Sequence, residues 1–265
     1  MKTFKLLIAL SLILVAGSCQ KVIDVDLNDA DPKIVIEANF NGTDSTVIVN
    51  VSYTSSFFDE FNQNNVNNAV VTITDGNGIS TGIPLTGNGI YELQNYLPTQ
   101  GMTYTIDVIH DGTTYSATSK LNTPLTMLEP TTEFYEQGFF GEEGGYLVFF
   151  TFNDPVGLGN YYNVVYRAND TLYNKVQDFV LGDDALTDGN FIERPVFDYF
   201  EVGDSISFEI QAIDKRVYDY YTELQTIAGG QSSAAPANPY FFWSNQGLGY
   251  FSAYYSSENG IKIVE

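Results

Sequence analysis

The chain has 265 residues, which is enough for one or two domains with sizeable hydrophobic cores. It contains 33 acidic and 11 basic residues, and the formal charge of −22 excludes the cationic surface that nucleic-acid binding needs. One cysteine and one histidine exclude a disulfide framework and a zinc site with several thiolates, and they disfavour histidine-based hydrolysis.

The first residues have the pattern of a secretory signal. Lys2 and Lys5 precede an apolar run over residues 6–15, which is too short to cross a bilayer because a spanning helix needs about 20 residues. Small residues then lead to Cys19. We expect a lipoprotein signal peptide over 1–18 and lipid attachment at Cys19, so that acyl chains such as palmitate anchor the mature protein. An ordinary signal peptide that leaves a free thiol is the alternative.

Residues 19–33 predict an acidic tether. Four aspartates are spread through this segment, which has no strand-like alternation. Runs of charge are commonly no more than solvated chain, and that interpretation stands beside a role as a surface-export signal.

Residues 34–122 predict an immunoglobulin-like β-sandwich. Apolar and polar residues alternate through segments such as 69–74 and 104–109, as half-buried antiparallel strands require. Turn signals at 75–78 and 111–112 follow these segments. Short strands separated by regular turns are typical of a sandwich.

Residues 131–265 predict a second, fibronectin-like sandwich. The alternation over 205–212 is the clearest strand pattern of the chain. The spacing of the apolar residues that follow predicts a helix near 215–228 that docks on this sandwich, with Asp214 as its N-cap and Gly229 at its end. Prolines interrupt the pattern between 122 and 132. The expected fold is therefore all-β, with two separately folded sandwich domains and one docked α-helix.

Aromatic side chains provide the candidate contact residues. Phe57, Phe58 and Phe61 lie in a long polar segment that is too irregular for a strand, and exposed rings on a loop favour a partner contact. Trp243 is the second choice for such a contact. For Trp243 and its aromatic neighbours, closure of the second core is the favoured alternative.

Motifs for catalysis or metal binding are weak. The acidic loop 183–190 offers oxygen ligands, but its spacing does not fit an EF-hand, and Asp, Asn and Gly are also ordinary turn residues. Turn chemistry is favoured there, and calcium binding stays open. The chain contains neither a G-x-S-x-G elbow nor a phosphate-binding P-loop. We therefore predict no catalytic residue, no metal ligand and no cofactor.

Two segments carry a family resemblance. The segment 19–27 (CQKVIDVDL), followed by 31–38 (DPKIVIEA), resembles the start of a Bacteroidota outer-membrane lipoprotein family that is known only as a domain of unknown function. Residues 238–251 resemble the closing motif of that family. The resemblance covers nearly all of the mature chain. It implies an outer-membrane location beside a TonB-dependent receptor, and it assigns no catalytic residue.

These observations lead to one hypothesis of function and one alternative. The hypothesis is a non-enzymatic, lipid-anchored outer-membrane protein that serves as an accessory or binding component beside a TonB-dependent transporter in nutrient uptake. The alternative is a structural or adhesive β-sandwich module of the cell surface. Hydrolysis is a weaker third class. The sequence leaves the ligand, the oligomeric state and the face of the outer membrane undecided.

Overall fold

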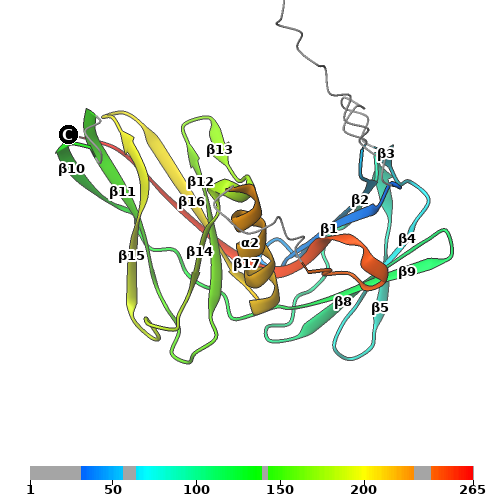
Figure 1. The fold of residues 1–265 in the computed structure, drawn as a ribbon. Coiled ribbons are helices and arrows are strands. Elements are labelled where there is room, and N and C mark those ends of the chain that lie inside the picture. The colour runs from blue at the N-terminus through cyan, green and yellow to red at the C-terminus, as the bar shows by residue number, and fades with distance from the viewer. Residues whose placement is uncertain (1–30, 56–63, 139–142, 230–239, 265) are drawn as a thin grey trace, which may run out of the picture. The chain divides into compact units, whose positions relative to one another are not determined.

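The computed structural model describes residues 31–55, 64–138, 143–229 and 240–264, and Pro32–Glu265 forms one compact unit (Figure 1). The predicted all-β class is confirmed, since strands make up most of the described chain. The helix α2 (Lys215–Ala228) is the α-helix of these ranges, and its bounds agree with the predicted helix near 215–228. No helix in the described ranges is both long and apolar enough to cross a membrane.

The strands and short helices follow one another along the chain in this order: β1 (Ile34–Asn41), β2 (Thr46–Tyr53), β3 (Asn64–Asn65), β4 (Val70–Thr74), β5 (Ser80–Ile83), β6 (Leu85–Gly87), β7 (Ile90–Leu93), β8 (Thr103–His110), β9 (Thr113–Lys120), β10 (Thr131–Gln137), β11 (Glu143–Asn153), β12 (Tyr161–Ala168), β13 (Thr171–Tyr173), η2 (Val176–Asp178), β14 (Val180–Asp183), β15 (Phe191–Phe200), β16 (Ser205–Ile213), α2, η3 (Ser244–Gln246) and β17 (Leu248–Lys262).

The described strands form three sheets. The large sheet is ten-stranded, with the order β13-β12-β16-β17-β1-β2-β7-β6, and β14 and β3 pair with its strands β12 and β2. A four-stranded sheet has the order β5-β4-β8-β9, and a three-stranded sheet has the order β10-β11-β15. The large sheet therefore contains strands from both halves of the chain.

Strand β17 joins the two halves. Its first part, up to Tyr254, pairs in parallel with β1, and from Tyr255 onward it pairs antiparallel with β16. The prediction of two separately folded sandwiches, 34–122 and 131–265, is therefore wrong. The prolines near 122–132 do interrupt the alternation, but such a break cannot reveal that a strand far along the chain pairs across it.

Two hydrophobic cores contain the odd-numbered side chains of β17, and the first core also includes buried residues of α2. Phe251 and Ala253 of β17 are buried in the first core, with the inward residues of β1, β2 and the four-stranded sheet. Ile263, after the end of β17, is buried in the second core, with residues of β11, β12, β15 and β16. Because side chains alternate along a strand, the even-numbered residues of β17 point to the opposite face of the large sheet.

Helix α2 lies on that opposite face. Asp214 caps its N-terminus by accepting a hydrogen bond from the backbone N–H of Val217 at 2.9 Å, as the sequence predicted. Tyr220 and Tyr221 pack against Tyr250 of β17, with ring centroids 6.1 and 5.2 Å apart. Its buried residues belong to the first core, and the elements that it contacts, η2, β12, β14 and β17, lie within 131–265, the part of the chain on which we expected it to dock.

Candidate functional site

The predicted contact residues have different outcomes. Cys19, Phe57, Phe58 and Phe61 lie outside the described residues. Trp243 is only 1% exposed, and its Nε1–H donates to the carbonyl oxygen of Ile36 at 2.9 Å. The prediction that Trp243 contacts a partner is therefore wrong. Its ring closes a core, as the alternative proposed, but this is the first core and not the second.

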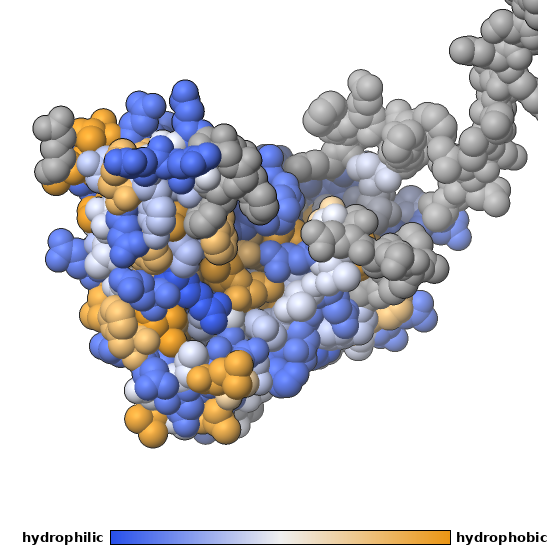
Figure 2. Space-filling view, turned by 60° about the vertical axis from the view of Figure 1, so that its left-hand side comes forward, coloured by the Kyte–Doolittle hydropathy of each residue, from blue (hydrophilic) through white to orange (hydrophobic). Residues whose placement is uncertain are grey.

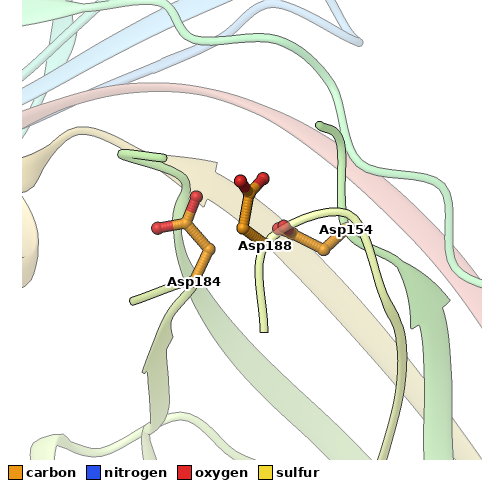
Figure 3. Close-up of side chains that lie close together, drawn as sticks. All are labelled: Asp154, Asp184 and Asp188. Carbon is orange, nitrogen blue, oxygen red and sulfur yellow. The ribbon is translucent and has the colours of Figure 1, made fainter. Parts of the chain in front are cut away.

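The acidic loop belongs to a cluster of three carboxylates (Figure 3). Asp184 and Asp188 meet Asp154, which follows β11, and oxygen atoms of the three side chains lie within 4.8 Å of one another. Asp154 and Asp184 are buried and Asp188 is exposed. Spacing along the chain could not reveal Asp154 as a member, because it lies on a different loop.

The three carboxylates tie two loops together. Asp184 accepts hydrogen bonds from the backbone N–H groups of Gly159 and Asn160, both at 3.0 Å, and Asp154 accepts one from Gly189. Burial tends to raise the pKa of Asp184, but its hydrogen bonds outweigh that effect and the pKa is lowered. Loop closure thus accounts for these carboxylates, in agreement with the favoured turn chemistry, and calcium binding stays open.

The same loops carry exposed apolar side chains at their tips. Val156, Leu158 and Leu186 are 90%, 72% and 96% exposed. Both loops lie at the lower edge of Figure 1, and Figure 2 shows apolar side chains at the corresponding lower tip. Exposed apolar side chains on loops that hydrogen bonds hold in place are typical of contact surfaces.

A polar furrow crosses the face of the large sheet that carries α2. It is a hollow of about 220 Å³, which we call the furrow. Strands β12, β16, β17 and β1 form its floor, and β13, the segment around η2 and α2 form its sides. Its lining consists of Asn39, Asn163, Val165, Leu172, Asn174, Phe179, Glu209, Gln211, Tyr221, Tyr250 and Tyr254. An adjoining hollow of about 270 Å³ shares Val165, Leu172 and Glu209 with it.

The alternation of side chains along the strands determines which residues form the polar floor of the furrow. On β16, Phe208 and Ile210 point into the second core, so Glu209 and Gln211 point to the furrow. Asn163 of β12 is the cross-strand partner of Gln211. The site therefore lies beside the point where β17 changes its partner, and strands of both halves of the chain build it.

A chain of side-chain hydrogen bonds runs across the floor. Gln211 donates through Nε2 to Oε1 of Glu209 at 3.1 Å, and Asn163 donates through Nδ2 to Oε1 of Gln211 at 3.2 Å. An ionised carboxylate only accepts hydrogen bonds, so it fixes the orientation of the Gln211 amide and, through it, that of the Asn163 amide. The Asn163 Oδ1 atom is then left buried, and no donor among the described residues reaches it.

Glu209 carries the charge of the furrow. Burial raises the pKa of its carboxyl group, the hydrogen bond from Gln211 acts in the opposite direction, and the nearby Glu258 and Asp44 raise it further. In the part of the chain that the structure describes, no lysine or arginine forms an ion pair with Glu209. The furrow therefore presents acceptor atoms and negative charge, bordered by aromatic rings.

Sequence reasoning missed these residues although two signals were present. Asn163 interrupts the apolar run Tyr161–Ala168, and Glu209 stands on the polar side of the most regular strand. A buried asparagine in an apolar strand must find partners, so it is an informative residue. The adjacency of β12, β16, β17 and β1 was not visible from spacing along the chain.

Comparisons with known proteins give a family and no activity. Residues 20–259 match the family described as Domain of unknown function (DUF4249). No curated protein matches the chain. Among solved structures, a two fibronectin type-III domain segment from chicken tenascin is similar over 68% of this chain and 90% of that chain, with 15% sequence identity and a TM-score of 0.22.

Proposed function

The chain belongs to the family Domain of unknown function (DUF4249), and we propose that it is a non-enzymatic, lipid-anchored binding protein of a bacterial outer membrane. In this proposal it works as an accessory component beside a TonB-dependent receptor in nutrient uptake. The observation that carries the binding role is the furrow, where the buried Asn163 Oδ1 lacks a donor inside a hollow lined by polar and aromatic side chains.

The N-terminal sequence supports the anchor. A basic start, a short apolar run and small residues lead to Cys19, the single cysteine of the chain. Residues 20–31 would then separate the lipid from the compact unit that begins at Pro32. A segment of this length spans at most about 40 Å when fully extended.

Hydrolysis is the weaker third class, and the observation that bears on it is a pair of carboxylates. Glu209 and Glu258 are cross-strand partners and line the same hollow. Neighbouring side chains on one sheet face point in the same direction, so both carboxylates would approach a substrate from the same side. A glycosidase places its two carboxyl groups on either side of the scissile bond. The pair therefore fits binding better than catalysis.

Membrane fractionation tests the anchor. Cys19→Ala removes the acylation site, and we expect the variant to lose palmitate label and to move from the membrane fraction to the soluble fraction. Wild-type protein that is unlabelled and soluble in the periplasm would overturn the lipid anchor.

Co-purification tests the partner. The proposal expects a TonB-dependent receptor to accompany the protein from gently solubilised membranes at low salt. Recovery of the protein alone would favour the free-standing structural or adhesive module. Phe57, Phe58 and Phe61 remain the proposed contacts, and changing all three to Ala should weaken the complex without unfolding the chain. Unchanged binding would reject this loop as the contact, and a large fall in melting temperature would identify the rings as core residues.

A further inference from the structure

We propose that the furrow binds the ammonium group of a small organic amine, held between Asn163 Oδ1 and the carboxylate of Glu209. This inference rests on the proposed binding function and adds the chemical class of the ligand.

The direction of the hydrogen bonds in the furrow favours a ligand that donates. Glu209 accepts from Gln211, and Gln211 accepts from Asn163, so the chain of bonds leaves an acceptor, Asn163 Oδ1, at its end. Asn163 is 1% exposed, and a buried acceptor without a donor destabilises the fold. A ligand group that meets this atom must therefore be a hydrogen-bond donor.

The charge of the furrow favours a cation. Glu209 and Glu258 face each other on neighbouring strands, and like charges placed directly opposite destabilise a sheet. Neither carboxylate forms an ion pair in the described ranges. Arg167 lines the adjoining hollow, and its guanidinium donates to the backbone oxygen of Asp170. A cationic donor in the furrow would supply the positive charge that the site lacks.

The aromatic border of the furrow also favours an ammonium group. Phe179, Tyr221, Tyr250 and Tyr254 line the furrow beside the acceptor atoms. Aromatic faces attract an ammonium group, and the attraction grows when the cation leaves water. A hollow of about 220 Å³ accommodates only a small ligand or the end of a longer one.

The lining also argues against anions. The residues of the furrow include no lysine or arginine, and the formal charge of the chain is −22. Such a field attracts cations and repels anionic ligands. A neutral polyol could still satisfy Asn163 and stack on the rings, so the experiment must separate a charged donor from a neutral one.

NMR titrations of the full chain without its signal peptide make this separation. The probes are n-butylammonium, its neutral isostere n-butanol, and methyl glucoside, and the readout is the side-chain amide signal of Asn163. We expect the ammonium probe to shift this signal with saturation, and the two neutral probes to leave it unchanged.

Glu209→Gln keeps the acceptor for Gln211 and removes the charge, so it should weaken ammonium binding by about tenfold or more. Glu201→Gln is the matched control, because it removes one exposed carboxylate outside the furrow, and it should bind as the wild type does. Asn163→Leu should also weaken binding. If this variant does not fold, the test of ammonium binding rests on Glu209→Gln alone.

Two results would overturn the inference. One is saturable binding of methyl glucoside that survives Glu209→Gln, which would make the furrow a polyol site. The other is the absence of a saturable shift with n-butylammonium. Either result leaves the lipid anchor and the receptor partnership to their own tests, so failure of this inference is distinguishable from failure of the proposed function.

Discussion

Asp214 and Ser119 lie 95 positions apart in the chain, yet the Ser119 hydroxyl donates to Oδ2 of Asp214 at 2.7 Å. The same carboxylate caps α2 through Val217 and accepts the backbone N–H of Lys120 at 2.8 Å. Ser119 Oγ in turn accepts the backbone N–H of Ala253 at 2.9 Å. One buried aspartate thus ties the start of the helix to β9 and, through Ser119, to β17.

Asp214→Ala should therefore cost more than the loss of a simple helix cap. A cap contributes about 0.5–2 kcal/mol, and each buried donor left without a partner adds about 1–3 kcal/mol. We expect a loss of about 2–4 kcal/mol in the free energy of unfolding, measured by urea denaturation. Asp219→Ala on the same helix is the control, since Asp219 forms an exposed pair with Lys215, and it should change stability by less than about 1 kcal/mol. Equal losses for the two variants would contradict this role of Asp214.

Gly249 permits the parallel contact between β17 and β1. Its φ is +93°, and a Cβ built on it would lie 2.1 Å from the carbonyl oxygen of Ile36. Gly249→Ala should therefore combine backbone strain of about 1–3 kcal/mol with a displacement of the paired strands. Gly78→Ala is the control, because Gly78 has a φ of +83° but open space around it. Thermal denaturation should show a clearly larger fall in Tm for the Gly249 variant, and equal falls would show that β1 and β17 tolerate the contact.

The helix shows what local pattern can predict. Asp214 at the N-cap, the apolar spacing and Gly229 at the C-cap are all local signals, and they predicted the bounds of α2. The surface on which the helix docks depends on Tyr250, which lies beyond the helix in the sequence. Local spacing contains no information about that contact, so it could not reveal that the helix also contributes to the first core.

Local pattern in the sequence could not predict the furrow. The alternation of β16 predicted that Glu209 leaves the core, but whether a polar side chain then meets water or a hollow depends on its neighbours across the strands. Asn163 and Gln211 come together only because β12 and β16 are adjacent. The predicted partner contact of Trp243 was wrong for a related reason. Its hydrogen-bond acceptor, the Ile36 carbonyl, lies near the opposite end of the chain.

Asp154→Asn should stabilise the protein at neutral pH. Burial raises the pKa of Asp154, the hydrogen bond from Gly189 acts against this, and Asp184 and Asp188 raise it further. The ionised carboxylate is therefore disfavoured in the folded state, while the Asn amide can still accept the Gly189 N–H. We expect a higher Tm at pH 7, measured by differential scanning calorimetry in buffer with a metal chelator. Asp170→Asn, on an exposed turn, is the control. A lower Tm for Asp154→Asn would contradict the assignment of repulsion within the cluster.

Glu209→Gln should separate ligand binding from stability. Burial raises the pKa of Glu209 in the folded state above the ordinary carboxyl value of about 4.3. Between these two pKa values the folded protein holds more protons than the unfolded chain, so wild-type stability falls as the pH rises through this window. The amide of the variant does not titrate there and still accepts from Gln211. Its Tm should therefore exceed that of the wild type at pH 7 and approach it near pH 4.

The measurement is thermal unfolding of both proteins across this pH range, with Glu201→Gln as the control for removal of one exposed charge. Replacing a residue that serves only the fold would lower the stability of the protein. Replacing a carboxylate that binds a cation should raise the stability of the ligand-free protein. Gain of stability together with loss of ammonium binding is the expected combination. A lower Tm for Glu209→Gln at pH 7 would show that the ionised carboxylate supports the sheet, and the cost assigned to it in the empty furrow would be wrong.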